Sequence, residues 1–586
     1  MKGSEYIAKF LKAIGANKVF LVQGGAISFM VDAIYREPDI DFICFQHEQA
    51  AAMAADALWR TNGQLGVTMA TSGPGASNLV TGIACGYYDS IPSLHIAGQV
   101  NYNEQRQYRG APVRQAGFQQ MDIVSMVCPV CKYAVAVSNH EEMREALKTA
   151  VEQAYAGRMG PVLVDIPMNL QNEEMADSEL LLPDPTTWAA DQNIDLQQVV
   201  DHVNQFFKSS QRPLVIFGAG VGLAGQQICL ETWLRDTGIP FVATWASLNY
   251  FDHSIPNYVG HFGVYGNRAG NFAIQNADKI LVLGSRLDNR QRSGNPNNFA
   301  PHAEILCVDI DPAELEKLDP ARYQTQMFDL RNLPDVLAGV QAPAISTEWA
   351  SYITDMKSRY FNQDTSGYSR DHGTMSPYRA VQKLLTLADK DAVITTDAGA
   401  NHCWVYQTFY KDRDQLLMTS SGHYAMGYAL PASIGAALVQ PSRQQICCNG
   451  DGGIQMNLQE LQTVKQYDLD VKVMIFNNQG LGMIKQFQDT YMGGRHVATS
   501  DDGPGRPNFA KIADAFDFDY VRVQTLEEIT SDLLASGRRI IEIVIDEGCT
   551  IEPKLEMGRP INDQMPYVSD QEFSDGNRFI SYERMR

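Results

Sequence analysis

The stretch CNGDGGIQMNLQELQTVKQYDLDVKVMIFNNQG, residues 448–480, decides the interpretation of this sequence. It has the pattern of a buried strand, a Gly-Asp-Gly turn, a helix, a second strand and an Asn-Asn pair. Because consecutive parallel strands end at the same edge of a sheet, Asp451 and Asn478 are expected to lie together where open α/β sheets bind ligands. Their oxygens suit a hard cation such as Mg²⁺. A short Gly-Asp-Gly is also typical of a simple tight turn, but the separation of 27 residues (478 − 451) favours the metal site.

Glycines in the same stretch indicate that an anion accompanies the cation. They allow the backbone to approach a phosphate closely, and a helix expected to begin after Gly453 would direct its first N–H groups toward it. The stretch therefore predicts a divalent cation that in turn holds a diphosphate.

Length and composition restrict the class of protein. The chain has 586 residues, of which 45% are hydrophobic and 20% charged, as in a globular protein of about two to four domains. The net charge of −21 argues against nucleic-acid and anionic-membrane partners, which require a basic surface. No apolar stretch approaches the roughly 20 residues that cross a bilayer, and the N-terminus lacks a signal-peptide core. A cytoplasmic location is expected.

Short apolar strands alternate with longer helical patterns in three segments of the chain, which predicts an α/β fold. The first and third segments are similar in size and strand content, which suggests two related domains. Polar stretches separate the segments, and a polar tail follows the third.

The Gly-Asp-Gly to Asn-Asn spacing resembles the signature of the thiamine-diphosphate-dependent enzymes. Within them, the runs HEQAAAMAADALWRTNGQLGVTMATSGPGASNLVTGIACGYYDSIPSLHIAGQV (47–100) and AMGYALPASIGAA (425–437) are similar to the large catalytic subunits of acetolactate synthase. The resemblance covers roughly residues 1–545 and implies three doubly wound parallel-sheet domains. These are a pyrimidine-binding domain (1–172), a middle domain (193–340) and a diphosphate- and Mg²⁺-binding domain (373–550), with a tail at 551–586.

The resemblance also implies how thiamine diphosphate and Mg²⁺ are held. The cation is ligated by Asp451, Asn478 and the carbonyl of Gly480, and the diphosphate lies against Gly452 and Gly453. Gly399 and Asn401 also belong to the cofactor-binding residues. Met426 would be the bulky residue that props the cofactor into its bent shape, although a lone methionine is otherwise ordinary core filler.

Glu48 begins an alanine-rich helix after a strand that ends near Phe45. A carboxylate in a first helical turn is commonly only a favourable N-terminal charge. The resemblance gives it a second role, in which it bonds the aminopyrimidine ring of the cofactor and activates it. In that family the sites lie between two subunits, so a homodimer or homotetramer is implied. Whether a small regulatory subunit also associates stays open.

The reaction implied is decarboxylation of pyruvate and transfer of the hydroxyethyl unit to a second 2-keto acid, a step of branched-chain amino acid biosynthesis. Phe118 and Gln119 would line the reacting centre, and Arg290 would bind the acceptor's carboxylate through its two-pronged guanidinium. Surface ion pairing is the alternative for Arg290. The sequence also leaves open a keto-sugar nucleotide as acceptor, a simple decarboxylase, and a binding protein that keeps the fold without the chemistry.

Departures from the family bear on the acceptor. Phe487 replaces a tryptophan that narrows the acceptor pocket, and Lys485 replaces an apolar residue beside it. A wider mouth with an added positive charge would suit an anionic acceptor, whereas a solvated lysine would have no such role. The tail IEPKLEMGRPINDQMP (551–566) is similar to that of related proteins found with surface-polysaccharide genes.

The middle segment bears on a second cofactor. The run GAGVGLAG (218–225) after a strand is a weak dinucleotide signal by itself. By resemblance a non-redox FAD binds here, although GVYG (263–266) replaces the family's GMHG and Asn289 replaces an aspartate. The residues that match the family's FAD site are Arg158, Gly218, Gly220, Thr244, Gly284, Arg286 and Asp309.

Overall fold

The computed structural model describes residues 1–105, 113–188, 194–361, 375–412, 414–499, 502–546 and 548–580. The domain boundaries predicted at residues 193 and 373, and the last residues of the tail (581–586), lie outside the described residues. The division into domains therefore stays a prediction. Among the described residues, no helix combines the length and the apolar character needed to cross a membrane.

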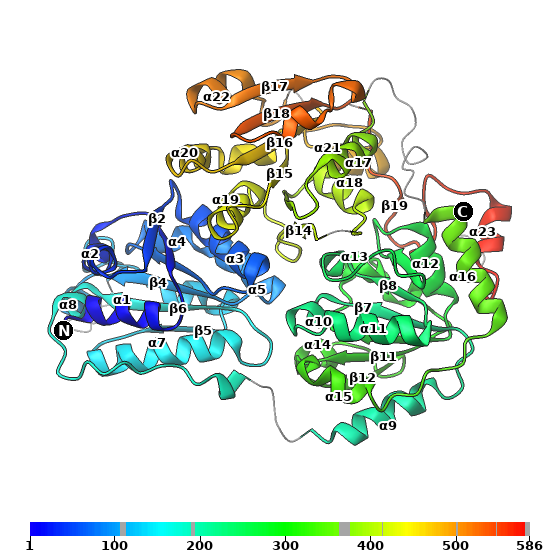
Figure 1. Cartoon of the computed structure of the whole chain (residues 1–586), viewed down its shortest axis with the longest axis horizontal. Helices are drawn as coiled ribbons and strands as arrows, with labels where there is room; N and C mark the ends of the chain where they lie inside the picture. The colour runs from blue at the N-terminus through cyan, green and yellow to red at the C-terminus, as the bar shows by residue number, and fades with distance from the viewer. Residues whose placement is uncertain are drawn as a thin grey trace.

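The described chain forms three six-stranded sheets in which all neighbouring strands run parallel, each flanked by helices (Figure 1). The fold class expected from the sequence, three parallel-sheet α/β domains, is confirmed. The first sheet has the strand order β2-β1-β3-β4-β6-β5 and the third β14-β13-β15-β16-β18-β17. Counted within each domain, these two orders are the same, whereas that of the middle sheet differs.

The N-terminal sheet is buried on both faces, as its continuous apolar strands require. Its strands are β1 (Lys18–Leu21), β2 (Asp41–Cys44), β3 (Gly66–Ala70), β4 (Ser93–Gln99), β5 (Tyr133–Ala136) and β6 (Pro161–Pro167). Its helices are α1 (Gly3–Ala13), α2 (Ser28–Arg36), α3 (Glu48–Asn62), α4 (Pro74–Asn78), α5 (Val80–Asp89), α6 (Ile123–Val127), α7 (His140–Tyr155) and α8 (Met168–Asn172).

The middle sheet has the order β12-β11-β10-β7-β8-β9. Its strands are β7 (Pro213–Phe217), β8 (Phe241–Ala243), β9 (Tyr258–His261), β10 (Lys279–Leu283), β11 (Glu304–Asp309) and β12 (Tyr323–Met327). Its helices are α9 (Leu196–Phe207), α10 (Ala219–Leu223), α11 (Gln227–Thr237), α12 (Arg268–Asn276), α13 (Asn289–Arg292), α14 (Pro312–Glu316), α15 (Leu333–Leu337) and α16 (Thr347–Tyr360).

The C-terminal sheet lies above the other two in Figure 1. Its strands are β13 (Val393–Thr396), β14 (Leu416–Met418), β15 (Gln445–Gly450), β16 (Val471–Asn477), β17 (Asp519–Val523) and β18 (Arg539–Val544). Its helices are α17 (Pro377–Leu387), α18 (Ala400–Thr408), α19 (Ala429–Val439), α20 (Leu461–Gln466), α21 (Gly482–Tyr491) and α22 (Phe509–Ala515), and the tail adds β19 (Lys554–Leu555), β20 (Gln564–Met565) and α23 (Asp570–Gly576).

One local prediction was wrong, because no α-helix begins directly after Gly453. Residues 453–456 form a single 3₁₀ turn, and α20 begins only at Leu461. Asn457 interrupts the helix with φ −134° and ψ 32°. Its side-chain Nδ2 donates to the carbonyl of Gly427 at 2.8 Å, which holds this segment against the loop that contains Met426.

The C-terminal domain packs against both of the others. Its helix α19 approaches α3 so closely that a Cβ on Gly435 would lie 2.4 Å from the carbonyl oxygen of Ala54. A charged cluster supports the same contact, because Arg60 pairs with Asp89 at 2.7 Å and Asp89 accepts the backbone N–H of Ser421 at 2.7 Å. The N-terminal and C-terminal domains are therefore held in one arrangement within the chain.

The described part of the tail folds onto the middle domain. Its apolar residues Leu555, Ile561 and Phe573 join the middle-domain core. Asn271 of α12 donates to the carbonyl of Ile561 at 2.7 Å, and Asn276 donates to that of Gly576 at 2.9 Å. Buried side chains of the middle domain thus fix the path of the tail.

Candidate cofactor and substrate site

The strand ends of the third sheet bring the predicted metal ligands together. Asp451 follows β15 and Asn478 follows the parallel neighbour β16, and both are buried. The Asp451 carboxylate accepts the backbone N–H of Gly480 at 3.0 Å. Burial raises the pKa of Asp451 to about 6, although the Gly480 N–H acts against this rise. A cation at this point would favour the ionised carboxylate, so these residues fit Mg²⁺.

Lys485 is not the solvated side chain that the sequence allowed. It is buried, and its ammonium donates to the carbonyl of Gln479 at 3.0 Å. It also lies 3.0 Å from where a Cβ on Gly480 would be, and Gly480 has a φ of 147° that a side chain would strain. Lys485 therefore contacts the loop that carries Gly480. An ammonium has three donors, so this hydrogen bond does not exclude an anionic partner.

Asp397 lies beside Gly453, one of the residues predicted to contact the diphosphate, and the sequence analysis did not name it. It follows β13, is fully buried, and accepts the backbone N–H of Tyr428 at 2.9 Å. Burial raises its pKa to about 7. A Cβ on Gly453 would lie 1.9 Å from its Oδ2, which has no hydrogen-bond partner among the described residues. A carboxylate at the end of an apolar strand was the available signal.

Gly399 and Asn401 lie at the start of α18 beside Asp397. Gly399 has a φ of 140°, in the region that favours glycine. The Asn401 amide donates to the carbonyls of Asp397 and Cys448 at 3.0 and 3.1 Å, while its Oδ1 has no partner among the described residues. Asn401 therefore ties two strand ends together at the site.

Met426 lies next to the glycine turn, as predicted for a residue that supports a cofactor. Its Cε is 3.8 Å from where a Cβ on Gly452 would be. The following residue, Gly427, has a φ of 86° and packs against Met456 and Asn457. The side chain is half-buried, so one side of it remains available to a ligand.

Glu48 and Gln119 meet at a second cluster in the N-terminal domain. Glu48 is 7% exposed, and its Oε2 accepts a hydrogen bond from the Asn78 amide at 2.9 Å. A Cβ on Gly75 would lie 3.1 Å from Glu48 Oε1, and one on Gly73 would lie 2.7 Å from the carbonyl of Gln119. One glycine turn therefore contacts both residues.

Phe118 stands out beside this second cluster. Its side chain is 85% exposed, which is unusual for an aromatic residue. Among the described hydrogen bonds and ion pairs, none joins Glu48 to Asp451, Asn478 or Gly480. The helix α3, which begins at Glu48, packs with Ile454 and Leu461 of the C-terminal domain in one apolar core.

A large cleft lies where the three domains meet. It contains about 1560 Å³ of space not filled by protein atoms, a volume that includes open solvent at its mouth. Gly218 does not line the cleft itself but packs against Gly284, which does: a Cβ on Gly218 would lie 2.2 Å from the carbonyl oxygen of Gly284. The other residues predicted for FAD line the cleft: Arg158, Gly220, Thr244, Gly284, Arg286 and Asp309.

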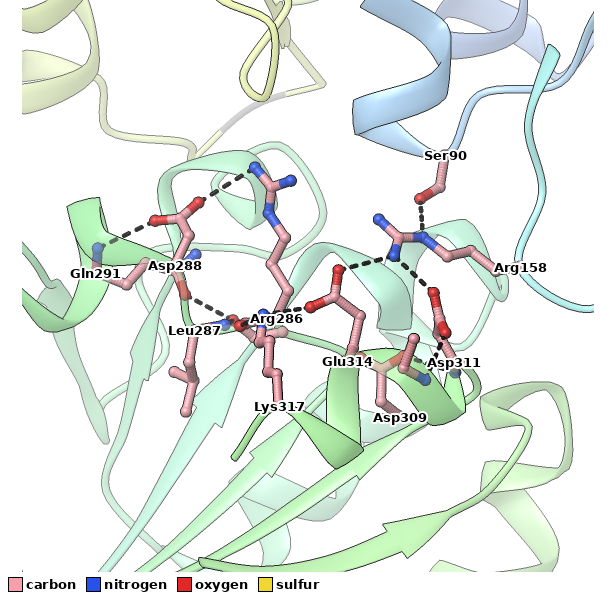
Figure 2. Close-up of polar contacts among 12 residues, drawn as sticks. Ser90, Arg158, Arg286, Leu287, Asp288, Gln291, Asp309, Asp311, Glu314 and Lys317 are labelled. Carbon is pink, nitrogen blue, oxygen red and sulfur yellow. Dashed lines mark hydrogen bonds and ion pairs between the residues drawn. The ribbon is translucent and has the colours of Figure 1, made fainter. Parts of the chain in front are cut away.

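Ion pairs occupy most of the arginines in this cleft (Figure 2). Arg158 pairs with Asp311 at 2.8 Å and with Glu314 at 2.9 Å, and Arg286 pairs with Asp288 at 3.2 Å. Asp309 is half-buried, and burial raises its pKa.

One buried donor in the cleft remains unused: the indole N–H of Trp245 has no partner among the described residues. An unsatisfied buried donor and several cations fit a polar, anionic ligand with a flat ring system. The residues present are therefore compatible with FAD.

Arg290 differs from the other arginines of the cleft. Among the described residues its guanidinium makes no ion pair, so the surface ion pair that the sequence left open is not found. The guanidinium carbon lies 4.0 Å from the centre of the Tyr424 ring. Its N–H groups are thus available to a carboxylate at the edge of the cleft.

Family models of the thiamine pyrophosphate enzymes match all three parts of the chain. The N-terminal TPP-binding domain matches residues 1–126, the central domain residues 200–328 and the C-terminal TPP-binding domain residues 397–539.

Similar proteins come from bacteria, archaea and plants. The acetolactate synthase isozyme 2 large subunit of Escherichia coli K12 is 33% identical, with 97% of this chain and 100% of that protein covered. The chain belongs to the acetolactate synthase family. A probable large subunit from Methanocaldococcus jannaschii is 33% identical (93% and 92% covered), and the chloroplastic acetolactate synthase 2 of Zea mays is 31% identical (96% and 88% covered).

Membership of the acetolactate synthase family makes the chain a thiamine-diphosphate-dependent enzyme of the acetolactate synthase type. The thiamine diphosphate expected from the sequence is therefore supported, and the chemistry-free binding protein is not. Several relatives are named large subunits, which implies that a smaller subunit accompanies those proteins.

Proposed function

We propose that this member of the acetolactate synthase family decarboxylates pyruvate and joins the remaining two-carbon unit to a second 2-keto acid. The observation that carries the proposal is Arg290, a guanidinium without an ion pair at the edge of the cleft. A guanidinium binds a carboxylate through two parallel hydrogen bonds and stays charged. Every 2-keto acid offers such a carboxylate, so Arg290 would hold the acceptor.

The residues around the third sheet would hold the cofactor. Mg²⁺ would take oxygens from Asp451, Asn478 and the Gly480 carbonyl, which fits the O-rich donor set of the loop. The diphosphate would lie against Gly399, Asn401, Gly452 and Gly453, and Met426 would support the ring system. Bound there, thiamine diphosphate supplies the electron sink that decarboxylation needs.

Glu48 would hold and pass the activating proton. Its carboxylate is buried yet reached by a side-chain donor, and this combination suits a group that exchanges a proton with a bound ring. Phe118 and Gln119 would cover the reacting centre and exclude water. As the family resemblance implies, two copies would complete each site, in a cytoplasmic homodimer or homotetramer.

A keto-sugar nucleotide is the weaker acceptor candidate. Its main support in the sequence was an added positive charge at Lys485, and that lysine is buried against the carbonyl of Gln479. The replacement at Phe487 remains, since its ring is partly exposed beside Tyr491 at 4.8 Å. A wider pocket alone does not favour a charged sugar over a small keto acid.

We also propose that the cleft binds FAD without using its redox chemistry. The support is the cleft's volume together with its cations and the unused indole N–H of Trp245. Flavin released by heat from the purified protein should approach one molecule per chain. An Arg286→Ala variant should retain less flavin, whereas a protein that binds no added FAD would contradict this assignment.

A Glu48→Gln variant tests the activating role. It should bind thiamine diphosphate within about threefold of wild type but lose about 10²- to 10⁴-fold in turnover, the usual contribution of a positioned acid or base. Glu141→Gln is the matched control, because Glu141 also lies in the first turn of a helix in the N-terminal domain but is exposed. Unchanged turnover in Glu48→Gln would refute the assignment.

A further inference from the structure

Tyr424 has an unusual backbone conformation beside the cleft. Its φ is +58°, in the left-handed region that bulky residues rarely adopt. Such conformations persist where the surrounding contacts fix them, and they gather at functional sites. The contacts of Tyr424 therefore indicate what its placement achieves.

The Tyr424 side chain bridges two domains. Its hydroxyl donates to the carbonyl of Gly399 at 3.4 Å, in the loop proposed for the diphosphate. Its ring meets the His402 ring edge-on at 5.2 Å, and the Arg290 guanidinium of the middle domain lies over its face at 4.0 Å. Tyr424 thus connects the cofactor loop of one domain to the cleft arginine of another.

The backbone of Arg290 is fixed independently of Tyr424. Asp288 caps the N-terminus of the short helix α13, and its carboxylate accepts the backbone N–H of Arg290 at 2.9 Å. The carbonyl of Arg290 accepts the N–H of Val264 at 2.8 Å. The direction of the long side chain is the remaining freedom, and Tyr424 is the described residue whose ring the guanidinium contacts.

Stacking on an aromatic face has a different consequence from ion pairing. Asp288 already serves Arg286 and the α13 backbone, so it does not neutralise Arg290. An arginine on a ring keeps its full charge and leaves its N–H edge open to a carboxylate. Arg290 and Tyr424 thus form a preorganised binding site for a carboxylate, at a fixed position relative to the Gly399 loop.

We propose that Tyr424 is the positioning residue for the acceptor: its ring holds Arg290 in the direction that binds the carboxylate of a small 2-keto acid. The inference rests on the proposed role of Arg290 and adds to it a residue that sets the distance between acceptor and cofactor. Loss of the ring would free the guanidinium and weaken carboxylate binding, and loss of the hydroxyl alone, which also bonds the guanidinium, would weaken it less.

The test measures binding of oxamate, an unreactive carboxylate shaped like pyruvate, to protein loaded with thiamine diphosphate and Mg²⁺. Calorimetry would compare wild type with Tyr424→Gly, Tyr424→Phe, Arg290→Met and the double variant Tyr424→Gly/Arg290→Met. Glycine suits the backbone at 424, so the fold should be retained. Asp468→Gly is the matched control, because Asp468 also has a positive φ (48°) but is exposed.

We expect Tyr424→Gly to weaken oxamate binding by about 3- to 30-fold, the range of a cation–π contact, and Tyr424→Phe by less than about threefold. The double variant should bind no worse than Arg290→Met, because the two residues act as one unit. Wild-type affinity in Tyr424→Gly, an additive double variant, or no binding by the wild type would each overturn the inference.

Acetolactate formation in the same preparations separates this inference from the proposed function. Oxamate binding that depends on both residues, in a wild type that makes no acetolactate, would contradict the proposed reaction and retain the carboxylate site. If the wild type makes acetolactate but oxamate binding is unchanged in the Tyr424 variants, the proposed reaction would be retained and the role of Tyr424 would be contradicted.

Discussion

At the residue scale, the tightest contact of the cofactor loop lies at Gly453. A Cβ there would be 1.9 Å from Asp397 Oδ2, and Asp397 cannot move easily because it is fully buried and accepts backbone N–H groups. Gly453→Ala should therefore lower the free energy of unfolding by about 2 kcal/mol and abolish thiamine diphosphate binding. Gly548→Ala is the control, since its nearest contact would be an ordinary 3.6 Å. Equal stability and cofactor affinity in the two variants would contradict the packing described.

Asp165 makes stability depend on pH. It is buried in β6, where Gln99 donates to its Oδ2 at 2.9 Å, and burial raises its pKa from the usual 3.8 to about 7. Between these values the folded state keeps a proton that the unfolded state has lost, so stability falls as the pH rises through this window. The total loss is up to about 4 kcal/mol.

The Asp165→Asn variant should remove this pH dependence. Its melting temperature should fall less than that of the wild type between pH 5 and pH 8, as scanning calorimetry would show. Asp201→Asn, at an exposed position, should keep the wild-type slope. If Asp165→Asn kept that slope as well, Asp165 would not be the titrating group.

The sequence placed Asp451 and Asn478 at the ends of neighbouring parallel strands, and the structure has them there, whereas their role as metal ligands stays a prediction. Sequence patterns left Lys485 either solvated or beside an anionic acceptor. The structure buries it and gives its ammonium a hydrogen bond to a backbone carbonyl of the loop, which removes only the solvated alternative. Sequence patterns also missed Asp397. Its carboxylate accepts backbone N–H groups of a loop about 30 residues away in the sequence, and a local sequence pattern does not contain information about contacts over that separation.

At the element scale, the contact between α3 and α19 depends on small residues. Gly435→Ala would normally stabilise a helix interior by about 1 kcal/mol. Here the added methyl would lie 2.4 Å from the Ala54 carbonyl and would push the helices apart. We expect a net loss of about 1–3 kcal/mol in the free energy of unfolding, measured with denaturant. Stabilisation by this substitution would show that the helices are not in close contact.

Strands were easier to predict than the turns and the tail. The runs around β15 and β16 are mostly apolar and almost wholly buried, because both faces of a parallel sheet are covered. The 3₁₀ turn after Gly453 depends on one contact, from Asn457 to the Gly427 carbonyl, which lies outside the local pattern. The tail shows no periodic pattern of apolar residues. Side chains of α12 bind its backbone, so the sequence of the tail itself contains little information about its path.

At the scale of the whole molecule, the proposed sharing of each site between two copies predicts complementation between two inactive variants. A Glu48→Gln chain keeps Asp451, and an Asp451→Ala chain keeps Glu48. Unfolded together and refolded as a mixture, they should recover about a quarter of wild-type activity, because half of the dimers are mixed and one of their two sites is intact. Each variant refolded alone is the control. No recovery in mixtures shown to contain mixed dimers would contradict sites shared between copies.

The central claim is that this enzyme transfers the two-carbon unit of pyruvate to a second 2-keto acid. The most direct test gives pure protein, loaded with thiamine diphosphate and Mg²⁺, pyruvate as its sole substrate and follows CO₂ and acetolactate together. The account predicts about one acetolactate for each CO₂ released, because Arg290 holds a second pyruvate where the first has reacted. Release of CO₂ without acetolactate would contradict it.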